Sequence, residues 1–281
     1  LLASPHSTVE ELYLAGALVR GLGSKSIVYR LRNAEHVVAG GVRWLGRSIA
    51  SLSVVNRVLI VGSNLRKEHP LFAQRIRQAA KRGAKVYAVG STRAEDWALA
   101  LQGAVQISAA EWFAELGKIA TAVAVLKDVP APTSAEADDA ATAVAKALVS
   151  GNEKAILLGN AVAHHEHASA LLGLANWIGQ QTGATVGYLT EAANTVGAQL
   201  VSAVPENGGL NAKQMLEGAA KALFLLNVEP GLDTSGGKAA ISGVAKSQMV
   251  VTLSPFRTNL DCSDVLLPIS PFSETAGSFV N

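Results

Sequence analysis

One turn in this chain has the residue types that bind an anion. Gly62-Ser63-Asn64 follows the apolar run 58–61 and precedes a helix that Pro70 favours. In a parallel α/β sheet, backbone N–H groups and the positive end of a helix converge after such a strand and can hold a phosphate. The fuller Gly-x-Gly-x-x-Gly pattern is missing, so the geometry of a tight turn explains the three residues as well. Gly62 and Asn64 are therefore candidate anion ligands with a purely structural alternative.

Two arginines follow later apolar runs in a similar way. The run 85–90 ends before Ser91-Thr92-Arg93, and the run 248–254 ends before Pro255-Phe256-Arg257. A guanidinium at a strand end can bind an anion through its N–H donors, and it can equally tether its own loop. The candidate anion ligands therefore also include Ser91, Arg93 and Arg257, with tethering of the loop as the structural alternative.

The histidines and the cysteine do not predict a metal centre or a nucleophile. His164-His165-Glu166-His167 has no second His or Cys cluster at a usual zinc spacing, so we interpret it as a polar first helical turn. Cys262 lies beside Asp261 and Asp264, whose charges would raise the pKa of its thiol. As the one cysteine in 281 residues, it excludes an intrachain disulfide and a thiolate-held iron–sulfur cluster within this chain. Gly-x-Ser-x-Gly is absent, and spacing assigns no Ser-His-Asp set.

The candidate strand ends belong to a pattern that occurs twice. The runs 58–64 and 85–93 have counterparts at 222–227 and 248–257, so that Ser254 lies 163 residues after Ser91, and Arg257 lies 164 residues after Arg93. Each copy continues to a short apolar segment, at 104–107 and 264–269. The duplication predicts two related α/β units.

Helix signals separate the predicted strands. Ser7, Ser108 and Thr133 each precede a Glu by three residues, the spacing of a capping box, and predict helices that end near residues 20, 126 and 149. A helix after Pro70 lies between the first two strands, and a helix at 164–182 lies between strands at 155–160 and 185–189. This alternation predicts parallel sheets with helices on both faces.

Composition excludes several other classes. The chain is 49% hydrophobic and 16% charged with a net charge of +2, which is too balanced for a typical nucleic-acid-binding protein. Glu68 interrupts the basic group between Arg66 and Lys85, so we interpret this group as a solvated helix face. The apolar runs are strand-sized, and the first residues do not form a signal peptide, so we expect a soluble, cytosolic segment. The start at Leu1 and the stop at Asn281 suggest a piece of a larger protein.

The motifs resemble one family when they are taken together. The stretches 61–70, 75–77, 83–86, 263–268 and 274–281 resemble the dinucleotide-like domain of molybdopterin-dependent oxidoreductases. Within that family, the chain is most similar to the large iron–sulfur subunit of NADH:quinone oxidoreductase, respiratory complex I. The stretches that carry this likeness are 3–6, 18–24, 30–32, 157–160, 182–189, 203–205 and 208–212.

The resemblance implies a fold. We expect two intertwined, similar three-layer α/β/α domains with mainly parallel sheets, as in formate dehydrogenase and DMSO reductase. The first unit, with an N-terminal helical segment, would span residues 1–130, and the second would span 131–281 and exchange strands with it.

The resemblance also implies a scaffold that has lost its molybdenum cofactor. Relatives that bind the cofactor usually carry an Asp-Pro-Arg turn after the second strand, whereas Gly90-Ser91-Thr92-Arg93 has no carboxylate to accept from a guanine amino group. We therefore expect no catalytic residue, cofactor or metal in this chain, and only vestigial binding residues. These are Gly62, Asn64, Ser91, Arg93, Arg257, Glu274 and Gly277.

The same likeness implies where the chain acts. Iron–sulfur clusters would lie in upstream domains, and the partners would be other subunits of the complex I peripheral arm on the cytoplasmic face of the bacterial inner membrane, without nucleic acid or membrane insertion. The chain would support electron transfer from NADH to quinone without activity of its own. One alternative is a fragment of a genuine molybdopterin-guanine-dinucleotide-dependent oxidoreductase. A thiamine-diphosphate-enzyme-like domain is weaker, because its Gly-Asp-Gly motif is missing.

Overall fold

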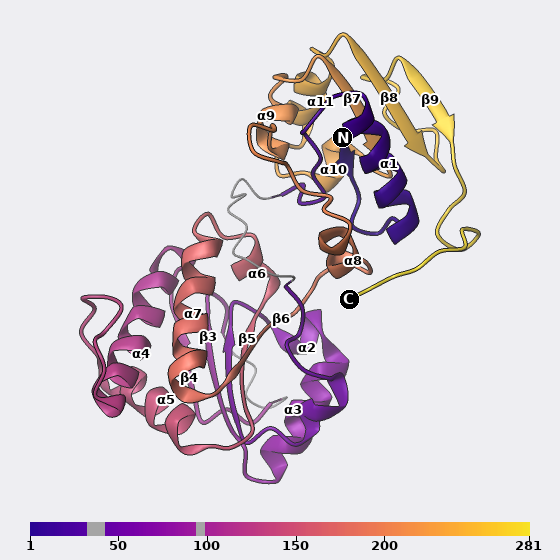
Figure 1. Ribbon diagram of the computed structural model, residues 1–281. Coiled ribbons are helices and arrows are strands. Elements are labelled where there is room, and N and C mark those ends of the chain that lie inside the picture. The colour runs from indigo at the N-terminus through magenta and orange to yellow at the C-terminus, as the bar shows by residue number, and fades with distance from the viewer. Residues whose placement is uncertain (33–42, 94–98) are drawn as a thin grey trace. The chain divides into compact units, whose positions relative to one another are not determined.

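The computed structural model describes residues 1–32, 43–93 and 99–281 (Figure 1). The chain forms two compact units. Val37–Glu191 make up the central unit, and Leu1–His36 together with Ala192–Asn281 make up the terminal unit. Each unit has its own sheet, and every strand pair in both sheets is parallel. The mixed α/β fold with parallel sheets is thus confirmed.

The central unit contains a five-stranded sheet with the order β4-β3-β2-β5-β6. Its strands are β2 (Arg57–Val61), β3 (Lys85–Gly90), β4 (Gly103–Gln106), β5 (Lys154–Leu158) and β6 (Thr185–Tyr188). Every residue of β5 is buried, as expected for the middle of a parallel sheet covered on both faces.

Helices cover both faces of this sheet and give three layers. One face packs against α4 (Trp112–Lys127), α5 (Asp139–Ser150) and α7 (Ala168–Thr182). The other face packs against α3 (Pro70–Lys81) and the 3-10 helix η1 (Ile49–Ser53). The alternation of strand side chains between the two faces produces these two separate apolar cores.

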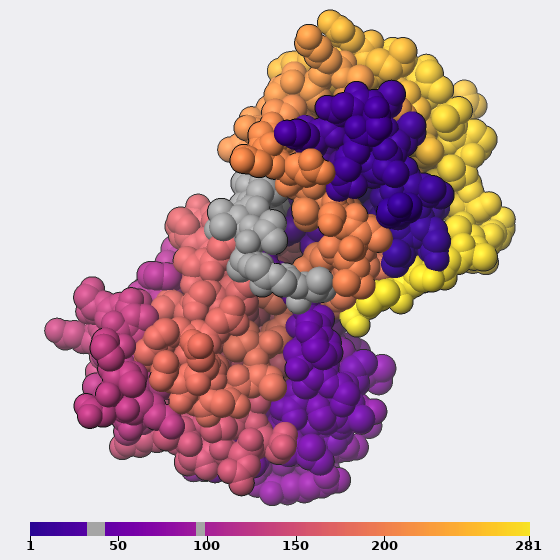
Figure 2. Space-filling view, viewed as in Figure 1, coloured from indigo at the N-terminus to yellow at the C-terminus, as the bar shows by residue number. Residues whose placement is uncertain are grey.

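The terminal unit contains a four-stranded sheet with the order β1-β7-β8-β9. Its strands are β1 (Leu2–Ala3), β7 (Ala222–Leu226), β8 (Met249–Ser254) and β9 (Val265–Pro268). Its helices are α1 (Val9–Gly21), α8 (Thr195–Leu200), α9 (Ala212–Leu216), α10 (Pro230–Asp233) and α11 (Lys238–Val244). The first residues therefore lie against the last third of the chain (Figure 2). In the sheet, Leu2 pairs with Leu225.

The duplication expected from the sequence is visible in the registers of the two sheets. Val61 pairs with Val89 in β3, and Leu226 pairs with Leu253 in β8. The residues after β2 and β7, Gly62 and Asn227, both have a positive φ, of 64° and 52°. Each donates its N–H to the carbonyl of the neighbouring strand, over 2.8 Å and 2.9 Å. The two units therefore share one strand-turn geometry.

The expected domain boundary at residue 130 does not coincide with the division into units. β5 and β6 lie beyond that residue, yet β5 extends the sheet of β2 with Arg57 beside Lys154. In the terminal unit, the position that β5 occupies is taken by β1 from the N-terminus. The expected boundary and the division into units differ because buried parallel strands carry no local signal for the distant strand they pair with.

Three helix starts test the capping boxes. Ser108 and Glu111 form the predicted box. The box before α1 is shifted by one residue to Thr8 and Glu11. The third prediction was wrong, because Asp138 caps α5 instead, and the Thr133 hydroxyl donates to the Gly117 carbonyl.

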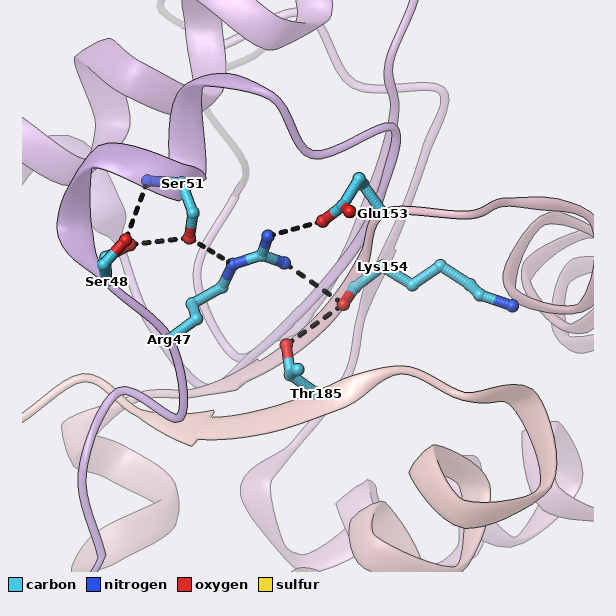
Figure 3. Close-up of polar contacts among 6 residues, drawn as sticks. All are labelled: Arg47, Ser48, Ser51, Glu153, Lys154 and Thr185. Atoms are coloured by element: carbon cyan, nitrogen blue, oxygen red, sulfur yellow. Dashed lines mark hydrogen bonds and ion pairs between the residues drawn. The ribbon is translucent and has the colours of Figure 1, made fainter.

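A half-buried arginine, Arg47, holds the segment before η1 against the sheet of the central unit (Figure 3). Arg47 donates to the Ser51 hydroxyl at 2.7 Å, to the Glu153 carboxylate at 2.9 Å and to the Lys154 carbonyl at 3.3 Å. Thr185 donates to the same Lys154 carbonyl at 3.1 Å. These bonds fix the segment beside β6, where a Cβ on Gly187 would lie 1.9 Å from the Leu45 carbonyl oxygen. The edge strand is thereby covered.

Within the described ranges, no helix has the length and apolarity needed to cross a bilayer.

Candidate functional site

A cavity of about 700 Å³ lies in the central unit at the carboxyl ends of β2, β3 and β4. The strand order reverses between β2 and β5, so the cavity lies beside the topological switch point, where open parallel sheets usually bind ligands. Residues from the short helices α2 (Leu65–Glu68) and α6 (Asn160–Ala163) and from the loop after α6 also line it.

The turn after β2 is built around a glycine that no other residue could replace without strain. Gly62 has a φ of 64°, and a Cβ there would lie 2.8 Å from Val162 Cγ2 and 2.9 Å from Trp112 Cζ3. These neighbours are apolar side chains of the core, so the glycine is required by packing and by the turn. The structural alternative for Gly62 is therefore the one that the geometry favours.

The polar groups of the same turn already have a partner within the chain. The Glu68 carboxylate accepts from the Ser63 hydroxyl at 2.7 Å and from the Asn64 backbone N–H at 3.2 Å. The Asn64 side chain accepts from the Lys67 N–H at 3.3 Å and so caps α2. A negative charge of the protein thus occupies the position in which a phosphate would accept these hydrogen bonds.

Exposed arginines surround the rest of the cavity. Arg66, Arg77 and Arg93 line it and are exposed, as are Ser91 and Thr92 from the turn after β3. The turn 90–93 has no carboxylate, so a group that offers N–H donors would find only hydroxyl and carbonyl oxygens there. Residues 94–98, which follow this turn, lie outside the described part of the chain.

The histidine cluster does not converge on one point. His164 Nε2 lies 2.7 Å from Glu191 Oε2, whereas His165 Nε2 lies 3.0 Å from the Ala109 carbonyl and its Nδ1 accepts from the His167 N–H. Among residues 1–32, 43–93 and 99–281, no group of three or more His, Cys, Asp or Glu side chains is arranged to hold a metal ion. Burial raises the pKa of the Cys262 thiol, as expected for an unreactive cysteine.

The remaining candidates belong to the terminal unit. Arg257 is exposed, and Glu274 forms a turn by donating its N–H to the Pro271 carbonyl. Gly277 lies so close to α1 that a Cβ would be 2.4 Å from Thr8 Cγ2. Of the predicted residues, the structure therefore brings Gly62, Asn64, Ser91 and Arg93 together around one cavity, and it places the other three in a different unit.

Sequence reasoning missed Glu68 and Asn194. Glu68 was detectable, because a carboxylate four residues after Asn64 can reach the turn once a short helix separates them. Asn194 had no local signal. It is fully buried, donates to the Ser7 carbonyl at 2.8 Å and accepts from the Val280 N–H at 2.9 Å.

The fold and the crevice define a class of protein with duplicated parallel α/β units and a cavity at the strand ends. The chain belongs to the molybdopterin oxidoreductase family, because the family model described as Molybdopterin oxidoreductase matches residues 1–281.

A comparison with solved structures agrees with this fold. The chain is similar to a chain of the formyltransferase/hydrolase complex from Methylorubrum extorquens in complex with methylofuran, with a TM-score of 0.55 and 15% identity over 95% of this chain and 78% of that chain. At this identity, the likeness concerns the fold alone. No curated protein matched the chain.

The family name raises the question of whether the crevice suits an anionic dinucleotide. Its first turn does not, because the Ser63 hydroxyl and the Asn64 N–H donate to Glu68, whose carboxylate would repel a phosphate. The Gly62 N–H is not available either, because it donates to the Val89 carbonyl at 2.8 Å. The residues after β2 therefore do not fit the phosphate part of such a group.

Proposed function

We propose that this chain is a structural module of the molybdopterin oxidoreductase fold that works without the cofactor, within the large iron–sulfur subunit of NADH:quinone oxidoreductase. The observation that carries the proposal is the Glu68 carboxylate, which accepts from the Ser63 hydroxyl and the Asn64 N–H at the strand end where a dinucleotide phosphate would lie. The module supports electron transfer by the whole complex and has no catalytic step of its own.

The energetics of the turn support this proposal. Hydrogen bonds to a charged group contribute about 1.5–3 kcal/mol, so displacing Glu68 would cost roughly tenfold or more in affinity for each bond that is not replaced. A displaced carboxylate would also remain close to the incoming phosphate and weaken its binding further.

The motifs of the sequence supply the rest of the proposal. The stretches 3–6, 18–24 and 208–212 resemble the complex I subunit, in which upstream domains carry the iron–sulfur clusters. In this role the chain contacts other subunits of the peripheral arm on the cytoplasmic face of the inner membrane.

The first experiment is native mass spectrometry of the chain purified from its own cells, with metal and pterin analysis of the same sample. We expect less than about 0.1 molybdenum or tungsten atom and less than about 0.1 pterin per chain, with recovery among respiratory subunits that oxidise NADH. Metal and pterin at near-stoichiometric amounts would overturn the proposal. Recovery in a complex without NADH oxidation would refute the assignment to complex I but not the scaffold role.

A second candidate is a fragment of a genuine molybdopterin-guanine-dinucleotide-dependent oxidoreductase. The observation in its favour is the cavity of about 700 Å³, which has the size of a ligand site and is lined by Arg66, Arg77 and Arg93. The metal and pterin analysis separates the two candidates directly.

A further inference from the structure

One face of the sheet in the terminal unit is apolar along three strands. Successive strand residues point to opposite faces, and the registers place Ala222 beside Met249, Val251 beside Val265, and Leu253 beside Leu267. We call this the open face. The registers place eight side chains on it: Ala222, Phe224, Leu226, Met249, Val251, Leu253, Val265 and Leu267.

The open face is exposed at Ala222, Met249, Val265 and Leu267, whereas Leu226 on the same face is buried beside α1 and the opposite face is covered. Met249 and Leu267 are each 46% exposed and Val265 is 38% exposed. On the opposite face, Leu223, Leu225 and Val250 are at most 1% exposed and pack with residues of α9 and α11. Figure 1 shows α9 and α11 gathered on the side of β7 away from β9.

The central unit shows what covers the equivalent face. The shared register makes Leu59 and Val89 the counterparts of Phe224 and Leu253, and these two residues are at most 2% exposed. They lie in the core that α4, α5 and α7 build, and α4 packs along both other helices. In the terminal unit, α1 takes the place of α7, and Phe224 and Leu253 are only partly buried beside it.

The chain after β9 takes a different path from the chain after β4. Residues 108–127 enter α4 directly after β4. After β9, the chain instead reaches the N-terminus of α1, where the Val9 N–H donates to the Ser278 carbonyl at 3.0 Å and the Ser278 N–H donates to Glu10 at 2.8 Å. The described residues of the terminal unit thus contain counterparts of β2, β3, β4, β5 and α7, but nothing in the position of α4 and α5.

The two faces also differ at the amino ends of their strands. The positions of Arg57 and Lys85 in the central unit are occupied by Ala222 and Met249 in the terminal unit, which extends the apolar surface. A helix that runs as α4 does, from the carboxyl to the amino ends of the strands, would place its negative C-terminal end near Lys221, which is exposed beside Ala222. The positive charge of Lys221 therefore complements the negative end of the dipole of such a helix.

We propose that the open face is a docking site for a pair of antiparallel amphipathic helices of a partner polypeptide, arranged as α4 and α5 are in the central unit. The docking side of this helix pair carries Ala, Val, Leu and Ile, the residue types with which α4 and α5 cover their own sheet. A helical partner is favoured over a second copy of the sheet, because the duplicated unit pairs this face with helices. The proposal goes beyond the proposed function and holds whichever complex contains the chain.

Site-directed photo-cross-linking in the cells of origin tests the docking site. A photoreactive residue is placed at Met249 or Leu267 of the full chain, and at Leu71 as the control, which is 70% exposed on α3. We expect the first two positions to cross-link to the same two consecutive helices of one partner, and Leu71 to cross-link to neither. Cross-links to a second copy of this chain, to the same polypeptide, or to no protein above the Leu71 background would overturn the proposal.

Matched substitutions give an independent readout. Leu267→Glu should lower the recovery of the cross-linked partner at least tenfold, while Leu267→Met and the control Leu71→Glu leave it unchanged. The thermal midpoint of each isolated variant reports whether it has folded. If folded Leu267→Glu recovers the partner as well as the unmodified chain does, the open face is not the docking site.

Discussion

Gly62 and Glu68 decide what the turn after β2 can hold. The glycine permits the left-handed backbone and the approach of Trp112, and the carboxylate takes the hydrogen bonds that a ligand would need. Both residues serve the protein's own structure, so the strand end keeps the shape of a binding turn without its free donors.

Gly62→Ala should destabilise the central unit by about 2–4 kcal/mol, because the new methyl group overlaps Val162 and Trp112 and the residue must keep a positive φ. Urea unfolding followed by tryptophan fluorescence measures this loss, since Trp44, Trp112 and Trp177 lie in the central unit and residues 1–32 and 192–281 contain no tryptophan. Gly173→Ala is the control. It sits in α7 with open space around its Cβ and should be neutral or stabilising by up to about 1 kcal/mol. Equal effects of the two substitutions would contradict the packing argument.

Glu68→Ala should free the Asn64 N–H and remove the repelling charge, so inorganic pyrophosphate should bind at least tenfold more tightly than to the unmodified chain. Isothermal titration calorimetry gives both affinities. Glu166→Ala removes another carboxylate from the lining of the same cavity without touching the turn, and it should leave the affinity within about threefold. Tighter binding by the unmodified chain than by Glu68→Ala would show that the carboxylate does not block the turn.

At the scale of elements, the last residues act as a strap across the start of α1 and α8. The Ser278 N–H donates to Glu10, and the Gly197 N–H donates to the Val280 carbonyl at 3.0 Å. The Asn194 side chain accepts from the Val280 N–H in the strap and donates to the Ser7 carbonyl in the turn that follows β1. It thereby joins the strap to this turn. These bonds tie the two distant parts of the chain that form the terminal unit.

Asn194→Ala should destabilise the terminal unit by about 2–4 kcal/mol, because the buried Ser7 carbonyl and Val280 N–H both lose their partner. Hydrogen exchange read by mass spectrometry should show faster exchange in the peptides that contain Val280 and Gly197. Asn207→Ala, at an exposed turn of the same unit, should change neither the stability of the unit nor the exchange of these peptides. Unaltered exchange in the Asn194 variant would mean that the strap is held by other contacts.

The strap should also respond to acid. The hydrogen bond from the Ser278 N–H holds the pKa of Glu10 below its ordinary value of 4.5. A carboxyl whose pKa is lower in the folded state stabilises that state above its ordinary pKa, and the contribution is lost as the pH falls through the lowered value. The NMR shift of the Ser278 amide should therefore titrate below pH 4.5, and Glu10→Gln should abolish the step. A midpoint at or above 4.5 would contradict the hydrogen bond.

At the scale of the whole molecule, the two units differ in how the chain builds them. The central unit is formed by one continuous stretch, whereas the terminal unit needs residues from both ends of the chain. β7 pairs with β1 on one side, and Leu1, Ala3 and Leu12 share a core with Leu226. The central unit therefore contains all the partners of its own sheet, and the last third of the chain does not.

A fragment of residues 43–191 should fold alone and unfold cooperatively, because it keeps the five-stranded sheet and both of its cores. A fragment of residues 192–281 should remain largely unfolded until residues 1–32 are added in trans, since it lacks β1 and α1. Circular dichroism measures the folding of both fragments, and tryptophan fluorescence also follows the unfolding of the first. Independent folding of 192–281 would show that β1 and α1 are dispensable.

Much of the fold follows from local sequence signals. Apolar runs that end in Gly62 or before Arg93 and Arg257, together with their repetition, predicted the duplicated parallel α/β pattern, and the Ser108–Glu111 box predicted its helix start. The box at Thr133 was wrong, because Asp138, later in the same loop, caps α5 instead. The expected boundary at residue 130 differs from the division into units, because β5 pairs with the distant β2, and local patterns do not measure that pairing.

The amino-acid sequence by itself determined that the segments of β2 to β9 form strands, that the turn after β2 needs glycine, and that no carboxylate follows β3 in the turn 90–93. Only the tertiary structure decided that Glu68 occupies the donors of the turn after β2, that β1 pairs with β7, and that Asn194 holds the strap. The physical reason is that turn geometry and hydrophobic period are local properties of the chain. Pairing and hydrogen bonding between distant residues depend on how the whole chain buries its apolar surface.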